Sequence, residues 1–194
     1  MSKVAELKKI LKFLHKVEEL KTLLRHSWLS SGRQESVAEH SWRIALATII
    51  LEPTIERKMD IAKVLKMSII HDLAEIFAGD HHAWQGKLKN KHQLEKLALI
   101  KLLKDLPQLQ RDEIQKLWEE YEARKTEEAK FVKALDKLET IDQHNLADLS
   151  TWVKEEYAYN LVHGTKESSY NPILKKLKQL IDEETKSKIS KSRN

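Results

Sequence analysis

A histidine and two carboxylates stand close together in an otherwise apolar stretch of the chain. His71, Asp72 and Glu75 occur within residues 61–78, where only two lysines add further charge. At about 100° of rotation per residue, the three groups fall on one arc of a helix. A buried carboxylate is costly unless it is paired or binds a metal. The pattern therefore fits either a buried ion pair or a site for a divalent ion, which imidazole nitrogens and carboxylate oxygens suit.

A metal site requires ligands from other elements, and two residues are candidates. His40 lies one turn into the helix that a Ser36–Glu39 capping box predicts, a position that also fits an exposed histidine. Asp136 adjoins an apolar stripe, and its spacing alone favours a surface ion pair with a neighbouring lysine. The residues by themselves leave the complete ligand set open.

The order His40, His71-Asp72, Asp136 resembles the H…HD…D pattern of the HD-domain metal-dependent phosphohydrolases. Three longer stretches are similar to the HD-domain 5′-deoxynucleotidases, including a eukaryotic branch: SVAEHSWR (36–43), HDLAEIFAGD (71–80) and WEEYEARKTEEAKFVKALDKLE (118–139). The resemblance covers residues 10–140 and continues more weakly into the last predicted helix. It implies an all-α fold, a single-domain HD-type bundle of about six to eight helices.

The resemblance implies a site for one divalent ion such as Mn²⁺, Co²⁺ or Mg²⁺. The four ligands of the family match His40, His71, Asp72 and Asp136. Its acidic catalytic residues match Glu75 and Asp80. Such an ion acts as a Lewis acid, activates a water and orients a phosphate, so the implied reaction is attack of that water on phosphorus. The sequence leaves open which acid serves the water and which serves the leaving group.

The segment before His40 is expected to bind the substrate, a deoxyribonucleoside 5′-monophosphate. Residues of the family that contact the nucleotide match an arginine and a tryptophan here, and the candidates are Arg25, Trp28 and Arg33. Arginine offers a bidentate fork to phosphate, and a tryptophan packed on the sugar would exclude a 2′-hydroxyl. The proline that often follows Gly79-Asp80 in the family is replaced by His81-His82, whose role stays open. The remaining histidines are expected to be structural or superficial: His15, His26, His92, His144 and His163.

The composition favours a few long helices. Four glycines and three prolines are too few for the many turns of a sandwich or barrel. Apolar periodicity, caps at Asp60 and Thr126 and a stop at Gly79 contribute to the predicted elements. These are a loop at 25–35 and helices over 4–24, 37–51, 61–78, 89–106, 107–124 and 126–149, with a last one of about 12–15 residues from Pro172.

Absent features narrow the class of protein. Zero cysteines exclude disulfides and thiolate zinc sites. No apolar run reaches the ~20 residues of a membrane span, and lysines interrupt the first 14 residues, so we expect a cytoplasmic protein without a membrane partner. The net charge of +5 comes from the two ends of the chain, since residues 27–185 contain 24 basic and 27 acidic side chains. A nucleic-acid polymer is therefore not expected as a partner.

We expect one domain over residues 1–185 and a basic, disordered tail over 186–194. The resemblance and the long amphipathic helices also suggest a homodimer. Two alternatives to the deoxynucleotidase remain, namely an HD hydrolase of another nucleotide phosphate ester and a non-catalytic helical nucleotide-binding or interaction module. A pure scaffold has no physical need for five intact polar residues, His40, His71, Asp72, Glu75 and Asp136.

Overall fold

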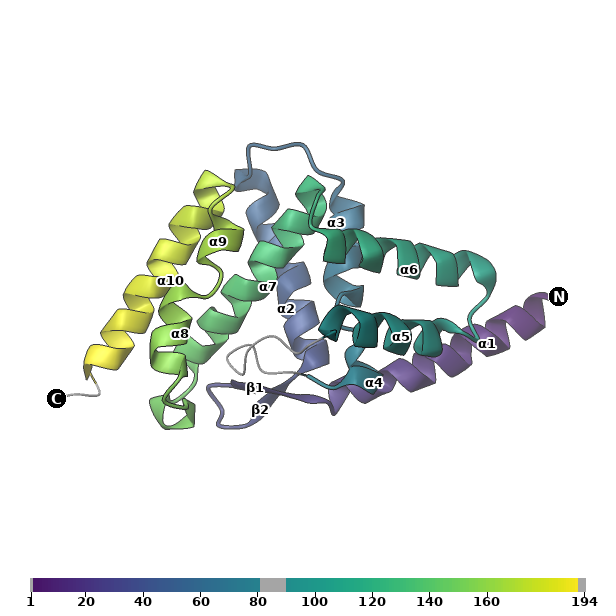
Figure 1. Ribbon diagram of the computed structural model, residues 1–194, viewed down its shortest axis with the longest axis horizontal. Coiled ribbons are helices and arrows are strands. Elements are labelled where there is room, and N and C mark those ends of the chain that lie inside the picture. Colours follow the sequence, from purple (N-terminus) through teal and green to yellow (C-terminus); the bar gives the residue numbers. More distant parts are fainter. Residues whose placement is uncertain (1, 81–89, 192–194) are drawn as a thin grey trace.

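A computed structural model describes residues 2–80 and 90–191, and it is helical almost throughout (Figure 1). Eight helices of seven residues or more lie in these ranges: α1 Lys3–Val17, α2 Val37–Leu51, α3 Ile61–Ile70, α5 Lys91–Leu103, α6 Gln108–Ala123, α7 Glu127–Leu146, α8 Glu156–Val162 and α10 Pro172–Lys191. The remaining elements of these ranges are two single-turn helices, α4 Glu75–Ala78 and α9 Thr165–Ser168, two short strands, β1 Leu24–Trp28 and β2 Gln34–Ser36, and the short 3-10 helices Glu18–Lys21, Glu52–Thr54 and Leu149–Thr151. The expected all-α fold is confirmed. No helix in the described ranges is long and apolar enough to cross a membrane.

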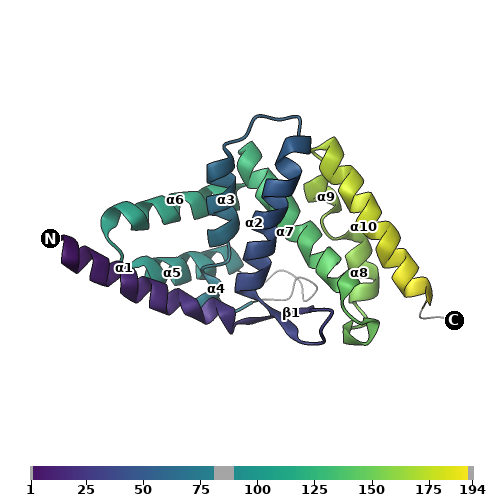
Figure 2. The ribbon, with the colours of Figure 1, turned by 180° about the vertical axis from the view of Figure 1, so that it is seen from behind.

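Three helices form the centre of the molecule. Helix α7 crosses α2 and α3, and the two views place α8, α9 and α10 at one end and α1, α5 and α6 at the other (Figures 1 and 2). One apolar cluster joins α2, α3, α7 and α10 through buried residues such as Ile44, Val64 and Phe131. A second cluster joins the turn after α3 to α5 and α6 through residues such as Leu73, Leu99 and Trp118. The central helices are therefore fixed from both sides.

Capping side chains start the central helices where the sequence predicts them. The Ser36 hydroxyl accepts a hydrogen bond from the Glu39 backbone N–H (3.3 Å), and the Glu39 carboxylate accepts one from the Ser36 N–H (2.9 Å). The side chains of Asp60 and Thr126 each accept a hydrogen bond from a backbone N–H in the first turn of α3 and of α7, respectively. Because these caps satisfy N–H groups that the first turn leaves free, they fix the start of the helices that hold the site.

The helix predicted over 61–78 is interrupted. Helix α3 ends at Ile70, residues 71–74 form turns, and α4 begins at Glu75. In this segment the Leu73 N–H bonds the Ile70 carbonyl (3.1 Å) and the Glu75 N–H bonds the Asp72 carbonyl (3.0 Å), tighter i→i+3 bonds than those of an α-helix. His71 and Asp72 therefore lie in the turn between two helices, and the single helical arc predicted for them is wrong.

Other elements also differ from the prediction. The helix predicted over 4–24 ends at Val17, and the predicted loop contains an antiparallel pair, β1 and β2. Helices α8 and α9 are not predicted by the sequence. Residues 186–191, expected in a disordered tail, form the end of α10, whose earlier turns bury residues at steps of three and four: Leu174, Lys178, Ile181 and Thr185.

Candidate active site

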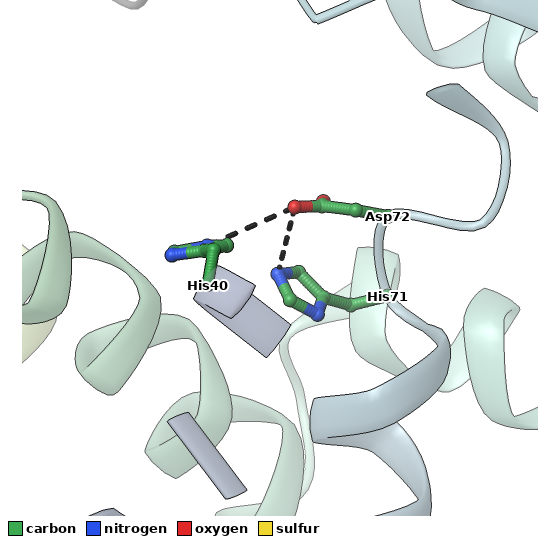
Figure 3. Close-up of side chains that lie close together, drawn as sticks. All are labelled: His40, His71 and Asp72. Atoms are coloured by element: carbon green, nitrogen blue, oxygen red, sulfur yellow. Dashed lines mark ion pairs between the residues drawn. The ribbon is translucent and has the colours of Figure 1, made fainter. Parts of the chain in front are cut away.

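Three separate parts of the fold bring the four expected ligands together. His40 comes from α2, His71 and Asp72 from the turn after α3, and Asp136 from α7. His40 Nε2 lies 3.7 Å from Asp72 Oδ2 and 3.4 Å from Asp136 Oδ1, and His71 Nε2 lies 3.0 Å from Asp72 Oδ2. Figure 3 shows the two imidazoles and the Asp72 carboxylate turned toward one another. Ligand atoms of these three residues lie within 4.8 Å of one another.

One ring nitrogen of each imidazole is placed so that it could bind a cation. His40 Nε2 and His71 Nε2 are buried, and neither has a hydrogen-bond partner in the described ranges. The other ring nitrogen of each is engaged: His71 Nδ1 with the Ser68 carbonyl (2.9 Å) and His40 Nδ1 with the Glu139 carboxylate. A hydrogen bond at Nδ1 selects the tautomer whose Nε2 lone pair can bind a metal. The residues therefore fit the divalent ion that the sequence implies.

The electrostatics favour positive charge at this point. Burial and Arg25 lower the pKa of His40, but Glu139 and Asp136 raise it more strongly, to about 9. Burial raises the pKa of Asp136, yet the charges of Lys133 and Lys137 hold it well below its usual value. The carboxylate therefore stays ionised, as a metal ligand must be.

Glu75 and Asp80, the expected catalytic acids, line one cavity together with Asp72 and Asp136. Glu75 starts α4 and is buried. Gly79 ends that helix with φ of +78°, a conformation that favours glycine. Burial, with the charges of Asp72 and Asp80, raises the pKa of Glu75 well above its usual value. A carboxyl group with a raised pKa is suited to carry a proton in acid–base chemistry.

The three expected substrate-binding residues are separated. Arg25 lines the cavity, and its guanidinium donates to Thr140 Oγ1 (3.0 Å) and lies 3.5 Å from Glu35. Arg33 instead pairs with Glu39, its side chain is 58% exposed, and it is not among the cavity residues. Trp28 is also absent from the lining. His81 and His82 lie outside the described residues.

The sequence does not single out several residues that line the same cavity. Lys133 and Thr140 lie on α7 three and four positions from Asp136, so the helical period could have found them, and Lys137 directly follows Asp136. The histidines expected to be structural or superficial include three that line it, His26, His144 and His163. The lining residues that come from α8 could not be predicted from the sequence, since no helix is predicted there.

Helix α7 also holds the strand that supplies Arg25. Besides the bond from Arg25 to Thr140, the Gln143 side chain donates to the Trp28 carbonyl (2.7 Å), and His144 Nε2 lies 3.1 Å from the His26 carbonyl. One helix therefore positions both a metal ligand and the strand β1.

Comparison with known proteins gives the class of this protein. A family model described as an HD domain matches residues 17–178. The chain therefore belongs to the HD-domain family.

Particular relatives and solved structures are similar over most of the chain. The 5′-deoxynucleotidase HDDC2 of Xenopus laevis is 37% identical over 139 residues, 70% of this chain and 68% of that protein. The 5′-deoxynucleotidase hdd1 of Schizosaccharomyces pombe is 35% identical over 173 residues, 80% of this chain and 85% of its own. A crystal structure of a predicted metal-dependent phosphohydrolase from Magnetospirillum magnetotacticum has a TM-score of 0.76 at 30% identity and covers 95% of this chain and 94% of its own.

Proposed function

We propose that this protein is a metal-dependent 5′-deoxynucleotidase that hydrolyses deoxyribonucleoside 5′-monophosphates to deoxynucleoside and phosphate. The observation that carries the proposal is the convergence of two buried, unbonded imidazole nitrogens with two ionised aspartates beside a cavity that also contains two catalytic acids. Relatives named 5′-deoxynucleotidases support the choice of substrate.

One divalent ion fits the ligand set of His40, His71, Asp72 and Asp136. When bound, such an ion supplies Lewis acidity toward a phosphate oxygen and lowers the pKa of a water. Carboxylate and imidazole ligands accept several ions, among them Mn²⁺, Co²⁺ and Mg²⁺, so the choice of ion is left to the experiment below.

Side chains of the cavity account for the remaining requirements of the reaction. Arg25, Lys91, Lys133 and Lys137 place positive charge around the position of a phosphate, and arginine adds a directional fork of donors. Glu75, with its raised pKa, exchanges a proton with the attacking water or the leaving 5′-oxygen. Asp80 faces the same space from beyond the end of α4 and serves the other of these two groups.

The test is phosphate release from a panel of deoxyribonucleoside and ribonucleoside 5′-monophosphates with Mn²⁺, Co²⁺ or Mg²⁺. We expect activity on the deoxy substrates and a loss of at least about a thousandfold in Asp72→Ala, because a ligand and its charge are removed. Asp105→Ala, which alters an exposed ion pair with Lys12, is the matched control. No activity with any ion, or an Asp72→Ala variant as active as the parent, would contradict the proposal. Equal cleavage of ribonucleotides would contradict the deoxy preference.

A homodimer is also part of the proposal. Four apolar side chains on successive turns of α1, each 53–63% exposed, form a continuous stripe: Val4, Leu7, Leu11 and Leu14. Such a stripe is typical of a helix that packs against a partner. Sedimentation should give a dimer for the parent and a monomer for Leu7→Glu/Leu11→Glu. A cytoplasmic location is proposed as well, and cell fractionation tests it.

A further inference from the structure

The cavity extends beyond the metal ligands to a wall formed by α8. Glu156, Tyr159 and His163, which line it there, come from α8 or the residue that follows it. Glu156 is only 1% exposed, and its Oε1 has no hydrogen-bond partner within residues 2–80 and 90–191. His163 Nε2 is a second buried atom without a partner in the same ranges. Two residues that line this wall therefore each carry a buried polar atom without a hydrogen bond.

The Glu156 carboxylate is held in a fixed orientation. Its Oε2 accepts a hydrogen bond from the Val153 backbone N–H (2.8 Å), which anchors one of the two oxygens. Oε1 lies 3.3 Å from His26 Nε2 and 3.8 Å from His144 Nε2. A buried acceptor oxygen that lacks a hydrogen bond is costly. Such a cost is expected where a ligand supplies the missing donor.

Cationic side chains gather beside Asp136. Lys133 Nζ lies 2.9 Å and Lys137 Nζ 3.5 Å from Asp136 Oδ2, where a phosphate would sit. A carboxylate at the α8 wall would repel that phosphate. The His163 ring, which packs on Tyr159 with 4.6 Å between centroids, stays neutral because burial and Lys137 lower its pKa to about 3. The α8 wall thus suits the uncharged part of a nucleotide.

We propose that the α8 wall is the nucleoside-recognition end of the active site, and that Glu156 Oε1 accepts a hydrogen bond from a donor of the nucleoside. The donor is either the 3′-hydroxyl of the sugar or an N–H group of the base, since both offer the same chemistry. Tyr159 and His163 form the adjoining surface. This inference rests on the proposed deoxynucleotidase function, and it makes Glu156 a determinant of specificity rather than of the chemical step.

The test compares Glu156→Gln with the parent on three substrates. They are a 2′-deoxynucleoside 5′-monophosphate, its 2′,3′-dideoxy analogue, and 1,2-dideoxyribose 5-phosphate, which has no base. Glutamine retains an oxygen for the Val153 N–H but can present an amide donor where Oε1 now lies. We expect KM for the deoxynucleotide to rise about tenfold or more with kcat little changed, as for a hydrogen bond to a charged group. Glu155→Gln, an exposed neighbour, is the matched control and should leave KM unchanged.

The three substrates distinguish the two sources of the donor. If Glu156→Gln raises KM for the deoxynucleotide but not for the dideoxy analogue, the donor is the 3′-hydroxyl. If the rise in KM is absent only with the baseless substrate, the donor is an N–H group of the base. An unchanged KM in Glu156→Gln, or an equal loss on all three substrates, overturns the assignment.

Parent activity separates this inference from the proposed function. A parent that cleaves the deoxynucleotide while Glu156→Gln loses nothing overturns the role of Glu156 alone. If the parent cleaves none of the substrates, the proposed function fails, and calorimetric binding of the deoxynucleotide to parent and variant decides the inference. Weaker binding by Glu156→Gln supports it, whereas equal binding or none overturns it.

Discussion

The two ends of the active-site cavity are built in different ways. At the metal end, each imidazole has a partner behind it, Glu139 for His40 and the Ser68 carbonyl for His71, and only Nε2 is left for a ligand. At the α8 end, Glu156 lines the cavity and its Oε1 has no hydrogen bond in the described part of the chain. The metal end is thus arranged around one ion, and the α8 end around a larger and more variable group.

This difference suggests how the two ends respond to substitution. The metal end depends on residues behind the ligands, because a metal tolerates little change in ligand position. The α8 end depends on side chains that meet the substrate directly, so its substitutions should alter KM and selectivity. Three predictions test the contrast, from the largest expected effect to the smallest.

Glu139→Gln tests whether the metal end depends on its supporting residues. The Glu139 carboxylate bonds His40 Nδ1, and burial raises its pKa while His40 and Arg25 lower it to a net value of about 2, so it is ionised. Removal of that charge should weaken binding of Mn²⁺ or Co²⁺ about 10- to 100-fold, as measured by calorimetry. Asp142→Asn, which also alters a partner of Arg43, is the control. Unchanged metal affinity in Glu139→Gln would show that metal binding does not depend on the charge of Glu139 beside His40.

Two arginines test where the phosphate lies. Arg25→Ala removes a cavity cation and should lower kcat/KM for a deoxynucleotide about tenfold or more. Arg33→Ala removes an exposed partner of Glu39 and should change kcat/KM less than about twofold. Steady-state kinetics on both variants measure the contrast. A larger loss in Arg33→Ala would mean that Arg33 reaches the substrate in the working enzyme.

The pH dependence of stability tests the burial of the α8 end. Burial and Lys137 lower the pKa of His163 from 6.5 to about 3 in the folded protein, whereas the unfolded chain keeps the ordinary value. The unfolded state therefore binds more protons below pH 6.5, and the free energy of unfolding should fall by about 1–2 kcal/mol between pH 7 and pH 5 through this group. His163→Asn should remove that slope in denaturant titrations, and His15→Gln, an exposed control, should not. An unchanged slope in His163→Asn would contradict the neutral, buried state of His163.

Much of the fold could be predicted because its signals are local. The Ser36–Glu39 capping box, the Asp60 and Thr126 caps and the Gly79 stop each involve residues a few positions apart, and all occur where they are predicted. The break after Ile70 could not be read in this way. The apolar pattern continues through 71–78, whereas in the structure the turn brings Asp72 Oδ2 to 3.7 Å from His40 Nε2 of α2 and 3.0 Å from His71 Nε2.

The sequence by itself determined the helical class, the main helix starts and the set of polar residues that could bind a metal, because periodicity, caps and an ordered motif are properties of short stretches. Only the tertiary structure decided which residues share the cavity. Arg25 donates a hydrogen bond to Thr140, 115 positions along the chain, while Arg33 donates one to Glu39 at the surface. Glu156 reaches the same cavity from a helix that the sequence does not predict. Contacts between segments so far apart depend on how whole helices pack, and the spacing of residues along the chain carries little information about that packing.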